Sequence, residues 1–179
     1  MKKIYLNFGH GGADSGAVGC DGKTLEKNLN RVIGLKVEKA LEKMGFSVFS
    51  YQQDKNVIQT YKEENKGAYD CAVSIHCNSS AIPTAQGVET LYYPTSTRGQ
   101  ALAQAIQKSI TANIKVRDRG IKERGDLCFL RKTKAPAALV EIGFISNPAE
   151  LQALKKAHRQ KSLADCIAAG IADFFNSQA

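Results

Sequence analysis

Short apolar segments with the character of buried strands alternate along this chain with longer segments whose apolar residues recur at helical spacing. Residues 4–8 are the first such strand, and a glycine-rich loop and a helical pattern over residues 25–44 follow it. Further strands are predicted at residues 46–51, 71–76, 87–93, 127–130 and 137–144, and further helices at residues 57–66, 96–111 and beyond Asn147. The alternation predicts an α/β protein built on a sheet.

The length of 179 residues fits one domain, predicted to fill residues 1–179. No apolar run reaches the roughly 18 residues that a membrane span needs. The basic start of the chain is followed by too few apolar residues for a signal peptide. We therefore expect synthesis without a secretory signal, or with the signal already removed.

Cysteine usage and charge narrow the possible partners. The five cysteines include no C-x-x-C pair, which favours reduced, mostly buried thiols over a cysteine zinc cluster. The net charge of +8 attracts polyanions, a class that includes nucleic acids, anionic lipids and cell-wall polymers. The densest basic stretch, residues 115–134, lacks the interleaved aromatic residues of single-strand nucleic-acid binders.

Two of the three histidines lie where predicted strands end. His10 follows the first strand within the sequence GHGG, and His76 closes the strand at residues 71–76. Ligands of open α/β sheets bind beyond the carboxyl ends of strands. Either histidine alone fits a structural role in a turn or in the core. Together they indicate a shared metal, whereas His158 lies among lysines and is expected on the surface.

Two glutamates could complete such a site, since a hydrolytic zinc ion takes three protein ligands and keeps one open position. Glu26 falls in the first turn of the helix after the His10 loop, although a solvated glutamate at a helix N-terminus fits there too. Glu141 interrupts the apolar run of residues 137–145. Burying a carboxylate is costly without a partner, so a metal, a catalytic proton or a buried arginine is expected beside it.

Four segments in order resemble the motifs of the zinc-dependent N-acetylmuramoyl-L-alanine amidases of phage endolysins and bacterial autolysins. They are residues 9–17 (GHGGADSGA), 25–28 (LEKN), 74–78 (SIHCN) and 139–147 (LVEIGFISN). The resemblance implies one Zn²⁺ held by His10, Glu26 and His76, with Glu141 as the catalytic acid–base. It also implies a twisted, mostly parallel six-stranded sheet with helices on both faces, of the phosphorylase/hydrolase-like kind.

The same resemblance implies a peptidoglycan hydrolase that cleaves the amide between N-acetylmuramic acid and the L-alanine of the stem peptide. No separate cell-wall-binding domain is expected, and the positive charge would favour anionic wall polymers. We expect a monomer without a nucleic-acid partner. Without an export signal, the protein is expected to reach the wall after lysis or through a holin, which points to a phage lysin.

Residues near the motifs receive narrower predictions. Asp14 could orient the His10 loop or simply form a turn. Asn78 is expected to pin the turn after His76 more readily than to touch substrate. Arg131 is a candidate for a peptide carboxylate, with a solvated arginine as the alternative.

Glu89 and Cys77 lie close to these residues in the sequence or the predicted sheet, but neither receives a catalytic or metal-binding role. Glu89 could face the site but receives no role. Cys77 follows His76 on a strand, so its side chain should point to the other face and not bind metal.

Two other functions stay open at the level of sequence. A zinc peptidase acting on stem peptides would use the same metal ligands. A non-enzymatic wall-binding or nucleic-acid-binding module would use the positive charge, but it would leave His10, His76 and Glu141 unexplained.

Overall fold

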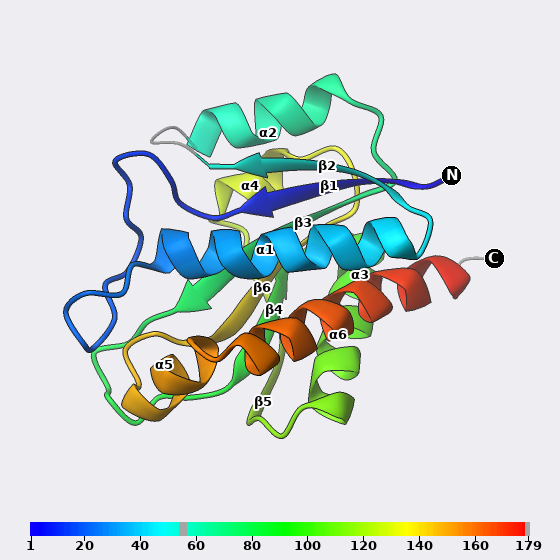
Figure 1. Ribbon diagram of the computed structural model, residues 1–179. Coiled ribbons are helices and arrows are strands. Elements are labelled where there is room, and N and C mark those ends of the chain that lie inside the picture. Colours follow the sequence, from blue (N-terminus) through cyan, green and yellow to red (C-terminus); the bar gives the residue numbers. More distant parts are fainter. Residues whose placement is uncertain (54–56, 178–179) are drawn as a thin grey trace.

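The computed structural model describes residues 1–53 and 57–177. Its centre is one six-stranded sheet (Figure 1). In spatial order its strands are β2 (Ser47–Gln52), β1 (Lys3–Phe8), β3 (Cys71–Asn78), β6 (Ala137–Phe144), β4 (Val88–Tyr92) and β5 (Asp118–Glu123). Neighbouring strands are parallel except for β4 and β6, which pair antiparallel. The mostly parallel six-stranded sheet expected from the resemblance is thus confirmed.

Helices cover both faces of this sheet. Four helices pack on one face: α1 (Glu26–Lys43), α3 (Thr97–Asn113), α5 (Pro148–Leu154) and α6 (Ala157–Asn176). In Figure 1, α1 and α6 run side by side over that face. The other face carries α4 (Cys128–Lys132), and α2 (Val57–Lys66) lies beside it, where the side chain of Asn65 donates to the carbonyl of Lys132 at 2.9 Å.

Strand β6 shows how the sequence divides the core between the two faces. Ala138, Val140 and Ile142 join the larger cluster under α1, α3 and α6. The intervening Ala137 and Leu139 join the smaller cluster against α4. Because helices cover both faces of the sheet, the sequence of β6 is a nearly continuous apolar run, as is typical of central parallel strands.

The sheet edge at the ends of β1, β3 and β6 gathers the polar residues. These three parallel strands finish together, and α1 begins there. Since β4 runs antiparallel to β6, it starts at the same edge. The register aligns His76 of β3 with Glu141 of β6, and Glu141 with Glu89 of β4, in one row on one face.

Two predictions of secondary structure are wrong. Residues 127–130 lead into the short helix α4 and do not form a strand, and the true fifth strand at Asp118–Glu123 was missed. A short apolar run does not distinguish a buried strand from a buried helix turn. The missed strand lies at the sheet edge and is strongly charged, as edge strands often are.

The other predicted helices and strands are found close to their expected positions, with one refinement at the C-terminal end. Asn147 caps α5 by accepting from the amides of Ala149 and Glu150. The helical C-terminal region is divided into α5 and α6. His158 is exposed, and three of the five cysteines are buried thiols. Among the helices of the described residues, none has the length and apolarity to cross a membrane.

Candidate metal centre

His10 takes its place from an unusual backbone and a carboxylate partner. It follows β1 with φ of 59°, the left-handed region that non-glycine residues seldom enter. Its Nδ1 donates to Oδ2 of Asp14 at 2.8 Å, and Oδ1 of Asp14 accepts from the amide of Gly16 at 3.0 Å. With Nδ1 holding the proton, Nε2 presents its lone pair. Asp14 therefore does orient the His10 imidazole, as one of its two predicted roles required.

Glu26 is a buried carboxylate at the start of α1, not a solvated one. Its side chain is enclosed, with 3% of the residue exposed. Oε2 accepts from the amide of Ala17 at 2.9 Å. Oε1 accepts from the amide of Cys77 at 3.1 Å and from the side-chain amide of Asn30 at 3.2 Å. These bonds fix the carboxylate at the sheet edge between the two histidines.

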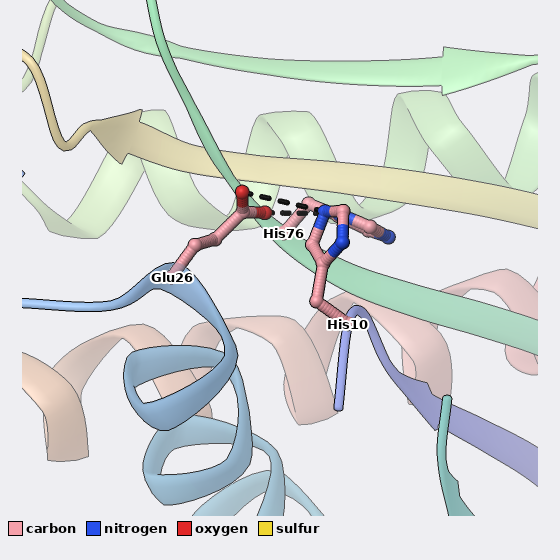
Figure 2. A group of neighbouring side chains, drawn as sticks. All are labelled: His10, Glu26 and His76. Atoms are coloured by element: carbon pink, nitrogen blue, oxygen red, sulfur yellow. Dashed lines mark hydrogen bonds and ion pairs between the residues drawn. The ribbon is translucent and has the colours of Figure 1, made fainter. Parts of the chain in front are cut away.

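The three predicted ligands converge, although they are far apart in the sequence (Figure 2). Nε2 of His10 lies 3.4 Å from Oε2 of Glu26, and Nδ1 of His76 lies 3.0 Å from Oε1. One ligand atom from each of the three residues lies within 4.8 Å of the others. Bonds of about 2.0–2.1 Å at tetrahedral angles place zinc ligands roughly 3.3 Å apart. The three side chains therefore have the spacing and the donor types of a zinc site.

Two glycines make room for this convergence. A Cβ on Gly9 would lie 2.1 Å from Cε1 and 2.2 Å from Nε2 of His76. A Cβ on Gly16 would lie 2.6 Å from Oε2 of Glu26 and from Cδ2 of His10. Both positions need the absence of a side chain, so the glycines of the loop shape the site as well as the turn.

The charges at the site are set by these contacts. Burial disfavours the ionised form of Glu26, but the hydrogen bond and charge of His76 and the amide of Ala17 outweigh burial and lower the pKa of the carboxyl. Burial likewise opposes protonation of His76, yet Glu26 and the negative charge of Glu141 raise the pKa of its imidazole.

Glu141 lies beside this group with an unused carboxylate oxygen. The residue is partly exposed at a cavity wall, but Oε2 is buried and has no hydrogen-bond partner within residues 1–53 and 57–177. Burial, reinforced by the charges of Glu26 and Glu89 and opposed by that of His76, raises the pKa of the Glu141 carboxyl to about 7. The buried arginine pair considered for Glu141 is not found in this described part of the chain.

A cavity of about 300 Å³ opens in front of these groups. Its wall includes His10, His76, Glu141, Arg124 and Cys128, together with apolar side chains of β4, α4 and β6. A molecule in this cavity would reach His10, His76 and the carboxyl of Glu141 at once.

A family model described as N-acetylmuramoyl-L-alanine amidase matches residues 4–173. This chain belongs to that amidase family. The germination-specific N-acetylmuramoyl-L-alanine amidase of Bacillus subtilis (strain 168) is 29% identical over 194 residues, which cover 99% of this chain and 81% of the relative.

Solved amidase structures share the fold across the whole length. The N-acetylmuramoyl-L-alanine amidase from Clostridium difficile 630 superposes with a TM-score of 0.94 at 33% identity, covering 99% of this chain and 98% of the other. The catalytic domain of the amidase CwlV from Bacillus (Paenibacillus) polymyxa var. colistinus gives a TM-score of 0.91 at 33% identity, covering 98% and 99%. The family and the fold implied by the four motifs are therefore confirmed.

Glu89 and Asn78 form a hydrogen-bonded pair next to the candidate metal site. Glu89 accepts from the side-chain amide of Asn78 at 2.9 Å, from Nε of Arg119 at 2.6 Å and from Nζ of Lys122 at 2.5 Å. Oδ1 of Asn78 accepts from the amide of Ser79 at 2.8 Å. Asn78 thus pins the turn after β3, the preferred of its two predicted roles, and Glu89 faces the row of His76 and Glu141.

The structure does not bring Arg131 to the catalytic cavity. Arg131 is exposed in the last turn of α4 and lines a different hollow, beside Tyr93 and Thr95. The arginine that lines the catalytic cavity is Arg124, which makes a bidentate pair with Asp126 at 2.8 and 2.7 Å. Sequence reasoning missed Arg124 because it immediately follows the strand that was not predicted.

Cys77 lies on the opposite face from His76, as predicted. Its side chain joins the larger apolar cluster and is not among the three groups that converge on a metal position. Burial raises the pKa of the Cys77 thiol well above its usual range, so the group stays protonated and unsuited to metal binding.

Proposed function

We propose that this amidase-family protein binds one Zn²⁺ and hydrolyses the amide between N-acetylmuramic acid and the L-alanine of the stem peptide in peptidoglycan. The observation that carries the proposal is the convergence of His10, Glu26 and His76 beside the unpartnered carboxyl of Glu141. His₂Glu is a ligand set found in catalytic zinc sites, which keep a further position open.

The three ligands would hold the ion, and Asp14 would keep Nε2 of His10 directed at it. Bound zinc supplies a Lewis acid for a carbonyl oxygen and lowers the pKa of water to about 7. The bonds from the Ala17 and Cys77 amides hold the Glu26 carboxylate in its ionised form, ready to bind a cation.

Glu141 would move the proton. Its carboxylate takes a proton from the water that attacks the lactyl carbonyl, and the protonated carboxyl then gives that proton to the nitrogen of L-alanine as the C–N bond breaks. A group that accepts and returns one proton works best with a pKa near the working pH. The burial that raises the pKa of Glu141 to about 7 meets that requirement.

Arg124 would orient the substrate. It lines the cavity beside Glu141, and its bonds to Asp126 use only Nε and one terminal nitrogen of the guanidinium. A guanidinium has five N–H donors, so donors remain for a carboxylate of the stem peptide. We place the peptide at this end of the cavity and assign Arg124 the substrate contact first considered for Arg131.

The remaining expectations belong to the same proposal and rest on the sequence. They are a single domain over residues 1–179, a monomer without a nucleic-acid partner, and action at the cell wall after lysis or passage through a holin. The net charge of +8 supports attraction to anionic wall polymers.

Digestion of purified peptidoglycan followed by mass spectrometry tests the proposal. We expect stem peptides with a free L-alanine amino terminus, no product after treatment with a chelator, and recovery on addition of Zn²⁺. Glu141→Gln should keep zinc and lose turnover. Cleavage between two amino acids would instead identify a zinc peptidase, and wall binding without any cleavage would identify a binding module.

A further inference from the structure

A group of basic side chains lies on the sheet face that carries α5 and α6, opposite the face of Glu141. It surrounds a hollow of about 430 Å³ between these helices and the loops that lead into β4 and β5. We call this feature the basic hollow. Its polar and charged lining residues are Gln86, Lys115, Arg117, Glu150 and Arg159.

The three cations of the basic hollow are unpaired. Within the described part of the chain, the side chains of Lys115, Arg117 and Arg159 make no hydrogen bond or ion pair, and Nε of Arg159 is buried without a partner. Neighbouring basic residues differ, since Arg119 and Lys122 both bind Glu89. A buried polar donor without a partner is costly, and an anion that accepts a hydrogen bond would satisfy it.

The one acid of the hollow is engaged elsewhere. Oε1 of Glu150 accepts from the amide of Gly87 at 2.9 Å, and Oε2 accepts from the amide of Phe144 at 2.7 Å. Burial lowers the pKa of the Arg159 guanidinium, and the negative charge of Glu150 raises it, but a guanidinium remains charged in either case. Three cations thus face a single carboxylate whose oxygens already accept two backbone bonds.

The loops that present these cations are held together. The amide of Val88 donates to the carbonyl of Arg117 at 3.0 Å. Gly87 has φ of 111°, and a Cβ there would lie 2.4 Å from the Arg117 carbonyl oxygen. Only glycine permits this close approach, which holds the loop of Arg117 against the start of β4.

We propose that the basic hollow binds a phosphate group, either free phosphate or a phosphodiester of an anionic polymer. Guanidinium groups match phosphate oxygens in geometry, and charge-assisted hydrogen bonds of this kind are the stronger ones. The lining residue Gln86 lies two residues before the start of β4 at Val88 and three before Glu89, which shares a row with Glu141. A polymer bound there would hold the sheet edge that carries the catalytic cavity close to its surface.

Direct binding measurements test this inference independently of catalysis. Inorganic phosphate and poly(glycerol phosphate) are titrated into the whole chain by calorimetry at about 0.15 M salt, where charges more than roughly 8 Å away are screened. The test variant is Lys115→Ala/Arg117→Ala. The matched control is Lys39→Ala/Lys43→Ala, which removes two exposed lysines of α1 and lowers the net charge equally.

We expect the test variant to bind phosphate about tenfold more weakly or worse, and the control to bind within about twofold of the parent. Arg159→Gln, which removes the charge but keeps amide donors, should weaken binding as well. Binding of both probes supports a general phosphate site, and binding of one alone assigns the site to that source. Equal affinities for the two double variants, or no binding of either probe by the parent chain, would overturn the inference.

Discussion

Replacing Gly16 by alanine perturbs the proposed zinc site through a single methyl group. The new Cβ would lie 2.6 Å from Oε2 of Glu26 and from Cδ2 of His10, whereas ordinary contacts begin at 3.4 Å. Both side chains, or the backbone of residue 16, must shift by about 0.8 Å to restore ordinary contacts, and metal ligands tolerate displacements of only about 0.2 Å. We therefore expect Gly16→Ala to weaken zinc binding at least as much as the loss of a supporting residue does, about 10- to 100-fold.

Gly22→Ala provides the matched control. Gly16 and Gly22 have almost the same backbone, with φ of 63° and 67°, but a Cβ on Gly22 would meet nothing within 4 Å. Both variants should lose about 1–2 kcal/mol of stability in the metal-free state, because an alanine resists the left-handed conformation. Only Gly16→Ala should also lose affinity for zinc.

Competition with a chromophoric chelator gives the zinc affinity of each variant, and urea unfolding of the metal-free proteins gives the cost of the backbone. Equal zinc affinities for Gly16→Ala and Gly22→Ala would refute the reasoning, because the two variants differ chiefly in the predicted contact with Glu26 and His10.

Three other perturbations test separate parts of the proposal. In metal-free protein, burial raises the pKa of Glu141 from 4.5 to about 7. Between these two pH values the folded state keeps a proton that the unfolded chain releases. The free energy of unfolding therefore falls by about 3 kcal/mol as the pH rises through this range. Urea unfolding at pH 5 and pH 8 should show that Glu141→Gln removes this loss, and parallel pH dependences would contradict it. Arg124→Gln should raise KM for peptidoglycan fragments several-fold with a smaller effect on kcat, and an unchanged KM would exclude the substrate contact. Lysis of whole cells should decline as salt increases, since salt screens the charge of +8; salt-independent lysis would show that charge does not tether the protein.

The candidate metal ligands could be predicted because their positions follow from the topology. His10 and His76 close neighbouring parallel strands, and Glu26 opens the helix that returns over them. The ends of such strands must meet at one edge of the sheet. Glu141 stood out because a carboxylate inside an apolar strand needs a reason for burial, and the structure gives its Oε2 no partner among the residues it describes.

The features that were missed depend on segments without a clear local pattern. Strand β5 is charged and lies at the sheet edge, so its composition resembles that of a loop. Because the strand was not predicted, the position of Arg124, which directly follows it, could not be predicted either. The apolar start of α4 predicts a strand because four residues are too few to show a helical period. The hydrogen bonds that Glu150 accepts from the amides of Gly87 and Phe144 are tertiary contacts, which a local sequence pattern does not predict.

Metal analysis of the purified protein tests the central claim most directly, because everything proposed for catalysis depends on His10, Glu26 and His76 sharing one ion. We expect one zinc per chain in the parent protein and in Glu141→Gln, and none in His76→Ala. Zinc retained in full by His76→Ala, or zinc lost from Glu141→Gln, would contradict the account.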